Sequence, residues 1–394
     1  MKRLRNKPVP RLSRDAERLI NLANALAASG STLEDRYWQN RLTAQITLLL
    51  DASNDVAITT ALDRLFETNL NANDTLVNQV ETLAESQTIH YEDRDWDVLL
   101  IAIPILAWSR YNIPSGPINR EAQETITAHL QAHILAHDAR AAVVPFCYSI
   151  DHMPEDFSAL RKLTRQLGHM AIGQTRAEFN IATPIQTAQL LADTRFILAG
   201  VAVLNGQALF RWQEEQAAST RASCLEQWRK QGYPNLLRLL PGCTVECLLP
   251  DAYFASCRES DKRIRSYTIQ AAVAYLEQAL KTSAGDLCAV VAGIGDERID
   301  EYRIGFLRRH NPQVVHGVVW PLYGAENDDF SPAVRKQVEN VLHQCKVGEI
   351  IALGGLFVPE FCDDCGAPLF PDTSGEMLHP ELPENTPLHA APLH

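Results

Sequence analysis

The hydrophobic periodicity of this chain changes near residue 95, and that change constrains the fold more than any other feature. Before it, apolar residues such as Leu19, Leu22 and Leu26 recur at spacings of three and four, which indicates amphipathic helices. We expect four helices within residues 13–88, with Ser13 capping the first and Gly30 ending it in a left-handed conformation. After residue 95, short apolar runs alternate with helical patterns, which is typical of α/β units.

The second part of the chain therefore predicts sheets whose strands run in both directions. Expected strands cover 98–107, 142–150, 196–204, 208–212, 244–249, 287–292, 299–308, 314–320 and 349–358, and expected helices cover 119–138, 218–232, 269–281 and 332–345. Asn205-Gly206 predicts a tight β-hairpin between the strands on either side, because a type I′ turn needs positive φ at both positions.

Similar features recur about 100 residues apart and raise the possibility of an internal duplication. Trp108 and Trp212 form one such pair and Cys147 and Cys247 another, although chance is the alternative explanation. The predicted fold is α+β or mixed α/β: an N-terminal helical module, two similar mixed-sheet lobes and a C-terminal Cys-x-x-Cys knuckle with an extended tail. The expected divisions are a disordered basic arm at 1–14, the helical module at 15–90, the lobes at 91–185 and 190–358, and the knuckle and tail at 359–394.

The charge of the chain is unevenly distributed. The formal net charge is 36 − 48 = −12, but residues 1–14 hold six Lys or Arg and no acid, which leaves 30 − 48 = −18 for the rest. An acidic body repels nucleic acid, so such binding would require the arm or a local patch; a solubilising arm is the alternative. The longest apolar run, from Val98 to Trp108, is too short to span a membrane and contains Pro104. We expect a cytoplasmic protein with free thiols and no membrane segment.

One motif carries recognisable chemistry. In Cys362-Asp-Asp-Cys365-Gly366, two thiolates at i and i+3 can chelate one tetrahedral ion, and the glycine permits the left-handed turn that closes a zinc knuckle. A second Cys-x-x-Cys is missing, so further ligands must come from elsewhere. His379 is the first choice, ahead of the other candidates, which are His389, His394, Cys345 and His343. An empty turn, a metal shared between two chains, and redox use are the alternatives to a structural zinc ion.

Two weaker patterns deserve mention. His129, His133 and His137 repeat at four-residue spacing on one expected helix, and we interpret them as flanking the core rather than binding metal. A candidate anion site consists of Ser115 and Gly116 before the helix at 119, with Arg110 and Arg211 facing a cleft between the lobes.

Several segments together resemble one known family. They are Arg11-Leu-Ser-Arg-Asp-Ala-Glu-Arg18, Trp108-Ser-Arg-Tyr-Asn-Ile-Pro-Ser-Gly-Pro117, Leu191-Ala-Asp-Thr-Arg195, Val318-Val-Trp-Pro-Leu-Tyr-Gly324 and Cys362-Asp-Asp-Cys-Gly-Ala-Pro-Leu-Phe-Pro371. In these the chain is similar, over nearly its whole length, to the bacterial domain-of-unknown-function family numbered 2863. The resemblance implies a cytoplasmic bacterial protein and assigns no activity, cofactor or catalytic residue.

Three functions are consistent with these patterns. The first is a binding or regulatory protein with a structural zinc knuckle, acting on a protein partner or as a homo-oligomer. The second is an enzyme or small-molecule binder that uses the anion site near Arg110 and Arg211. The third is nucleic-acid binding through the basic arm and knuckle. Since the chain has no Gly-x-Ser-x-Gly elbow, Walker loop or His-Glu-x-x-His motif, whether it is an enzyme stays open.

Overall fold

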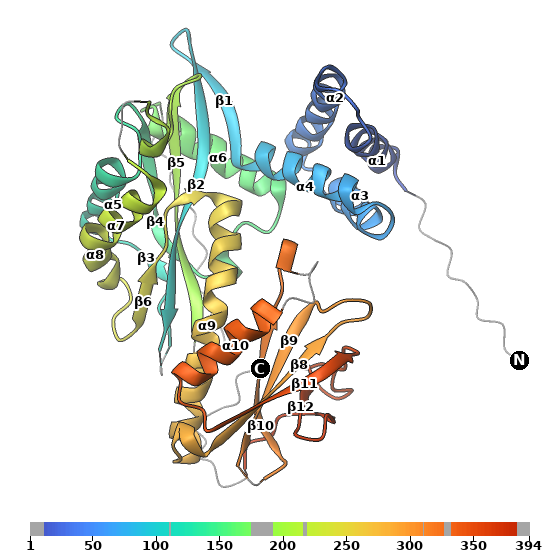
Figure 1. Cartoon of the computed structure of the whole chain (residues 1–394). Helices are drawn as coiled ribbons and strands as arrows, with labels where there is room; N and C mark the ends of the chain where they lie inside the picture. Colours follow the sequence, from blue (N-terminus) through green and yellow to red (C-terminus); the bar gives the residue numbers. More distant parts are fainter. Residues whose placement is uncertain are drawn as a thin grey trace, which may run out of the picture.

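The computed structural model describes residues 12–109, 112–174, 192–215, 219–309, 311–326 and 332–383. The fold is mixed α+β, as the sequence predicts: a helical module, a large sheet, a smaller sheet and a C-terminal segment (Figure 1). A long helix, α9 (Tyr253–Leu280), runs from the large sheet to the small one. Short 3₁₀ helices are η1 (Ile150–His152), η2 (Arg211–Gln213), η4 (Ala284–Asp286) and η5 (Gly324–Glu326).

The N-terminal module contains the four predicted helices. They are α1 (Arg14–Ala27), α2 (Thr32–Asp51), α3 (Asp55–Thr68) and α4 (Leu70–Glu85). The Ser13 hydroxyl accepts the N–H of Ala16 at 3.1 Å, which confirms the predicted cap. The predicted role of Gly30 is wrong, because α1 ends at Ala28 in a right-handed conformation, before the glycine is reached.

The module is anchored to the large sheet through α6 (Phe157–Ala171). The Arg161 guanidinium of α6 pairs with Asp51 at 2.9 Å and donates to the carbonyl of Leu83 at 2.7 Å. Because Arg161 is buried, these contacts satisfy a charge that would otherwise be costly in the interior. The sequence predicted neither α6 nor this junction.

The large sheet is antiparallel throughout, which corrects the expectation of a mixed sheet here. Its path is β1-β2-β5-β4-β3, and β6 and β7 also pair with β2. The strands are β1 (Ser86–Tyr91), β2 (Arg94–Trp108), β3 (Gly116–Pro117), β4 (Arg140–Tyr148), β5 (Ala192–Leu204), β6 (Thr244–Cys247) and β7 (Asp251–Ala252). Strand β5 pairs with β2 along one edge, and β1, β7 and β6 pair with successive parts of its other edge. Most of the backbone of this long apolar strand is therefore hydrogen-bonded on both sides.

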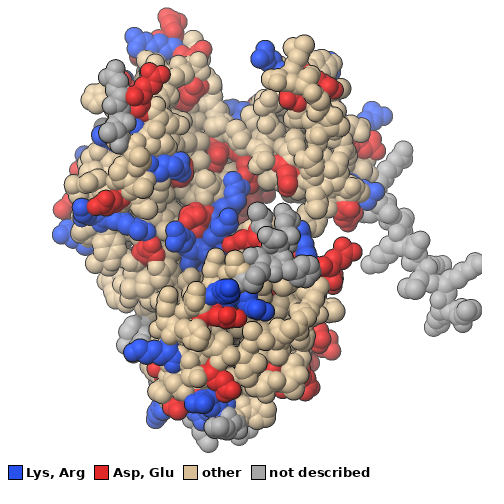
Figure 2. Space-filling model, in the orientation of Figure 1, with Lys and Arg blue, Asp and Glu red and all other residues tan. Residues whose placement is uncertain are grey.

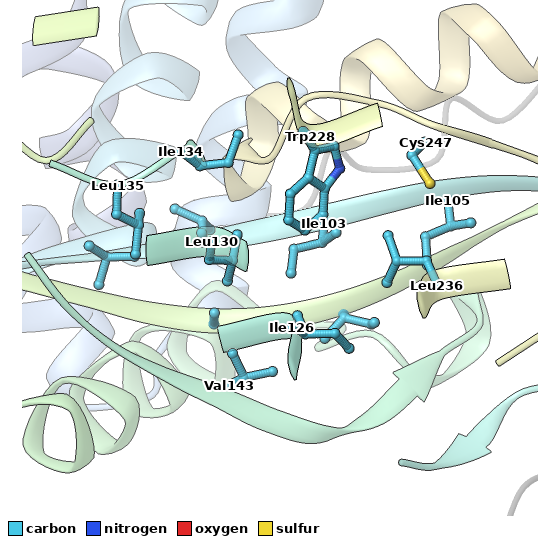
Figure 3. Close-up of a cluster of buried hydrophobic side chains, with 14 of the residues drawn as sticks. Ile103, Ile105, Ile126, Leu130, Ile134, Leu135, Val143, Trp228, Leu236 and Cys247 are labelled. Atoms are coloured by element: carbon cyan, nitrogen blue, oxygen red, sulfur yellow. The ribbon is translucent and has the colours of Figure 1, made fainter. Parts of the chain in front are cut away.

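Both faces of β2 are also buried, which explains why its sequence is apolar without alternation. Ile103 and Ile105 pack in one buried cluster with Ile126 and Leu130 of one layer of helices, and the ring of Trp228 lies beside Ile103 (Figure 3). That layer consists of α5 (Arg120–His133), α7 (Arg221–Gln227), the π-helical segment η3 (Trp228–Gly232) and α8 (Tyr233–Leu237). Helix α6 and the first part of α9 cover the opposite face.

The predicted hairpin at Asn205-Gly206 is wrong in its second strand. The turn exists, with Gly206 at φ +80°, and the Asp97 carboxylate accepts from both turn residues at 2.9 and 3.1 Å. However, β5 already lies between β2 and β4, so neither of its edges is free to pair with a returning strand. The predicted strand at 208–212 therefore does not form: residues 208–210 leave the sheet, and η2 begins at residue 211.

The predicted division at residue 190 is also corrected. Strands β5, β6 and β7 complete the large sheet, so residues 190–358 do not form one lobe. Cys147 of β4 and Cys247 of β6, expected at equivalent places in two lobes, lie in the same sheet. The two sheets differ in strand order and direction, so the expected similarity between lobes is not seen.

The small sheet has the order β10-β9-β8-β11 and is mixed, because β11 runs parallel to β8. Its strands are β8 (Leu287–Ile294), β9 (Glu301–Arg308), β10 (Val314–Pro321) and β11 (Glu349–Phe357). One face packs against the second half of α9 and against α10 (Pro332–Gln344). The other face is covered by the C-terminal segment, whose Phe370 packs against Val290 and Leu307. Within the described ranges, no helix is long and apolar enough to cross a membrane.

Candidate metal centre

The C-terminal segment lies against the small sheet at a place where two glycines face each other. Gly305 of β9 and Gly317 of β10 are cross-strand partners. A Cβ atom on Gly317 would lie 2.2 Å from the ring of Phe370, and one on Gly305 would lie 2.2 Å from the carbonyl oxygen of Pro371. Only glycine permits this approach, so the pair forms the seat on which the segment docks.

Arg303, two residues before Gly305 on β9, donates hydrogen bonds to the same segment. Its side chain is 1% exposed, and its Nη1 donates to the carbonyl oxygens of Glu360 at 2.6 Å and Leu369 at 2.9 Å. The Glu301 carboxylate accepts from its Nε at 2.7 Å, so the buried charge is paired. The residues held by Arg303 flank the Cys-x-x-Cys motif on both sides.

Between those two anchors the chain forms the predicted knuckle. The N–H of Cys362 donates to the carbonyl of Ala367 and the N–H of Gly366 donates to the carbonyl of Cys362, both at 2.8 Å. Gly366 has φ +72°, which confirms its predicted left-handed conformation. Cys362 and Cys365 consequently project from one tight turn.

A second hairpin brings in the histidine. Strands β12 (Phe370–Pro371) and β13 (Met377–Leu378) pair around a turn in which the Asp372 carboxylate accepts the N–H groups of Ser374 and Glu376 at 2.8 and 2.9 Å. Burial raises the pKa of Asp372, but these hydrogen bonds outweigh burial and hold it below its usual value. The extended tail that the sequence predicts after the knuckle therefore contains a short hairpin at 370–378. His379 follows β13 directly.

The three predicted ligands converge. One donor atom from each of Cys362, Cys365 and His379 lies within 4.8 Å of the other two, and Cys365 Sγ lies 3.4 Å from His379 Nε2. Zinc–sulfur and zinc–nitrogen distances of about 2.3 and 2.0–2.1 Å in a tetrahedron place such atoms about 3.6 Å apart. The observed spacing fits a zinc ion with two thiolates and one imidazole.

Backbone groups also prepare the first cysteine to bind a metal. The N–H groups of Cys365 and Asp364 point at the Cys362 sulfur and lower the pKa of that thiol below its usual value. This is the pattern by which amides stabilise a metal-bound thiolate. Cys365 is exposed and the other two ligands are half-buried, so a metal ion here would be open to solvent.

The whole chain was compared with known proteins. The model of the family described as "Protein of unknown function (DUF2863)" matches residues 4–393. The chain belongs to this family. No curated protein and no solved structure matches it. In this DUF2863 chain, the metal centre consequently rests on its own residues and on the geometry given above.

The remaining ligand candidates do not join the centre. His343 is exposed on α10 and Cys345 lies just beyond that helix, and neither belongs to the group of converging donors. His389 and His394 lie outside the described residues. The described part of the chain thus offers three candidate ligands at this place, and zinc prefers four.

Three of the four residues of the candidate anion site are described by the structure, and they do not lie together. Gly116 pairs with Cys147 and, with Ser115, lies before the start of α5, whereas the N–H of Arg211 donates to the carbonyl of Ile134 beyond the end of α5. A 14-residue helix is about 20 Å long, so these groups lie at opposite ends of it. Arg211 also donates to the carbonyl of Gln131, and Arg110 lies outside the described residues.

Two of the three histidines at α5 pack against each other. The rings of His129 and His133 stack with centroids 5.7 Å apart, and Asn235 contacts His129 at 3.0 Å. Burial lowers the pKa of His133, as does the neighbouring His129. The helix ends at His133, so His137 leaves the expected face.

The sequence predicted the three candidate ligands but not the residues that position them. In the sequence, Arg303 is one charged residue in a predicted strand, and Gly305 and Gly317 are residues that disfavour strands. A glycine inside an apolar strand is a signal that another backbone segment approaches the strand closely. The neighbouring sequence does not identify that segment as residues 370–371. The charges around these elements are also mixed: Figure 2 shows Lys and Arg interspersed with Asp and Glu over the visible face.

Proposed function

We propose that this protein binds one zinc ion through Cys362, Cys365 and His379, and that the ion fastens the C-terminal segment over the small sheet. The observation that carries the proposal is the convergence of the three donor atoms within 4.8 Å of one another. Two thiolates and one imidazole are ligands that zinc prefers, and two hairpins of the chain present them.

The proposed role is structural because of what the metal-bound segment covers. Phe370 and the partly buried Leu378 pack against the apolar face formed by Cys288, Val290 and Leu307. Without an ion, the two hairpins that carry the proposed ligands are tied to the sheet by Arg303, the glycine seat, this apolar contact and the Glu381 N–H, which donates to the carbonyl of Val314 at 2.9 Å. Metal binding adds a cross-link between residues 362 and 379 and therefore couples to the folding of the segment.

The fourth coordination position is left for water or for a ligand outside this group. A solvent-open position is typical of catalytic zinc sites, whereas structural sites are closed. A regulatory or binding role for the protein, with the zinc centre as its scaffold, is the function that we favour, since the proposed ligands lie on the segment that covers the apolar face of the small sheet.

The test is elemental analysis of protein purified without a tag and without added metal. We expect about one zinc per chain, and we expect the Cys362→Ser, Cys365→Ser and His379→Ala variants to lose it. Cys345→Ser and His343→Ala are matched controls, because these residues lie outside the group and should leave the zinc content unchanged. Zinc retained by all three ligand variants, or metal-free wild-type protein, would refute the proposal.

A further inference from the structure

A separate pocket lies where the large sheet meets the small one. It has a volume of about 360 Å³ and is lined by Glu246 of β6, Tyr267 and Gln270 of α9, Trp320 of β10 and residues of α10. Such a volume is within the range of small-molecule sites. In Figure 1, α9 and α10 lie beside each other to the right of β6, and residues of these three elements line the pocket.

Uncharged amide groups dominate the free hydrogen-bonding capacity of this pocket. Gln270 projects from α9, and Gln337, Asn340 and Gln344 follow one another at spacings of three and four along one face of α10. In the described part of the chain, none of these four carboxamides has a hydrogen-bond partner. Each carries two donors and one acceptor oxygen, so the group can pair with donors and acceptors alike.

One residue of the pocket lining, Trp320, carries a buried donor without a partner within the described ranges. The Trp320 side chain is 2% exposed, and its indole N–H has no hydrogen-bond partner among the residues that the structure describes. The ring is held in place by the Arg265 guanidinium, which lies 4.8 Å from its centroid. A buried donor without a partner is unfavourable, so an acceptor supplied by a ligand would be favoured here.

The charged groups of the pocket are already paired within the protein. The Glu246 carboxylate accepts from Arg229 and from the Tyr267 hydroxyl, and Arg263 donates to Glu259 at 2.9 Å. Sugars are commonly held by carboxylate oxygens that accept from their hydroxyl groups, and each oxygen of Glu246 already accepts one hydrogen bond within the protein. The groups left for a ligand are the neutral amides, one indole N–H and aromatic rings, together with the Ser266 hydroxyl and the Nη groups of Arg263.

We propose that this pocket binds a nucleobase, either free or as its nucleoside. A carboxamide pairs in two-point fashion with the adjacent donor and acceptor on a base edge, as Asn and Gln do with adenine. Tyr267 offers an aromatic ring that is fixed by stacking on Trp108, with centroids 4.0 Å apart. This binding would occur independently of the zinc centre, since no residue is shared between the two sites.

The test uses the full chain with adenine, adenosine, cytosine and cytidine as probes, and with ribose and glucose as comparison compounds. Ligand-observed NMR detects binding, and calorimetric titration gives the Kd. We expect a base and its nucleoside to bind with similar Kd, because the base edge is what the amides contact. Binding of ribose or glucose in place of the bases, or no binding of any base or nucleoside, would overturn the proposal.

Variants then locate the site. Asn340→Ala and Gln344→Ala are on the exposed rim and leave the core intact, and each should weaken base binding several-fold. Trp320→Phe keeps the ring and removes the N–H donor, and should weaken it about tenfold. Lys336→Ala and His343→Ala, on the same helix but outside the pocket, are matched controls that should bind as the wild type does. Base binding that is unchanged in all three pocket variants would also overturn the assignment.

Discussion

Gly305 and Gly317 are cross-strand partners in the small sheet, and together they form the surface against which Phe370 and Pro371 pack. This contact joins β9 and the edge strand β10 to a hairpin near the C-terminal end of the chain. Because Arg303 lies on the same strand as Gly305 and donates to residues on both sides of the knuckle, β9 contacts the segment both there and at Pro371.

Gly305→Ala should displace the C-terminal segment, because the added Cβ would lie 2.2 Å from a backbone oxygen that cannot rotate away. We expect a loss of about 1–3 kcal/mol in the free energy of unfolding, measured by denaturant titration. Gly354→Ala on β11 is the matched control, since a Cβ there meets nothing within 4 Å, and its effect should be under about 0.5 kcal/mol. Equal stability of the two variants would contradict the role of the seat.

Arg303→Met should destabilise the protein by about 2–4 kcal/mol, because it leaves the carbonyl oxygens of Glu360 and Leu369 without their shared donor. The loss should be accompanied by faster proteolytic cleavage within residues 359–383. Arg120→Met serves as the control, since Arg120 is an exposed arginine paired with Glu124. Proteolysis of the C-terminal segment at the wild-type rate would show that Arg303 does not hold it.

Stability should depend on pH through Glu85 at the end of α4. Burial raises the pKa of this carboxyl to about 7, against the opposing effect of the Phe254 N–H that it accepts at 2.9 Å. Since the pKa in the folded state is above that in the unfolded state, the stabilising contribution is complete below pH 4.5 and is lost as the pH rises through 7.

The unfolding free energy of the wild type should consequently fall between pH 5 and pH 8, by up to about 3 kcal/mol from this group alone. Glu85→Gln should remove that part of the dependence, whereas substitution of the exposed Glu17 by Gln should leave it in place. Denaturant titrations at both pH values measure the difference. Identical pH profiles for Glu85→Gln and the wild type would rule out Glu85 as the source.

Chelation should change the reactivity of two cysteines and spare the buried ones. In protein with zinc bound, Cys362 and Cys365 should resist alkylation, and both should react once a chelator has removed the metal. Cys147 and Cys247 should stay unmodified in either state, because they are buried and their burial raises the thiol pKa to about 12. Mass spectrometry of peptides from the alkylated protein reads out each site, and alkylation of Cys362 and Cys365 at the same rate before and after chelation would argue against a metal there.

Local sequence patterns predicted those parts of the molecule that are determined locally. The four helices of the module follow from the spacing of their buried residues and from the Ser13 cap, and the knuckle follows from Cys362, Cys365 and Gly366. His379 was predicted because a neutral imidazole suits zinc and the tail after the motif can fold back to place it. Each of these depends on contacts within a few residues or on chemistry that the residue type itself supplies.

Long-range pairing decided what the sequence did not predict. Asn205-Gly206 is a strong hairpin signal, but β5 pairs with β2 on one edge and with β4 on the other. The chain after the turn therefore leaves the sheet. Helix α9 is twice as long as expected because its first half, polar along one side, packs on the large sheet through Tyr253 and other buried positions. The glycine seat is likewise visible only when β9, β10 and Phe370 are seen together.

X-ray absorption at the zinc edge, on protein purified without a tag or added metal, tests the central proposal most directly. We expect bound zinc with two sulfur neighbours at about 2.3 Å and an imidazole nitrogen at about 2.0–2.1 Å, as Cys362, Cys365 and His379 would supply. Protein without zinc, or zinc surrounded by oxygen and nitrogen alone, would contradict the assignment of this centre.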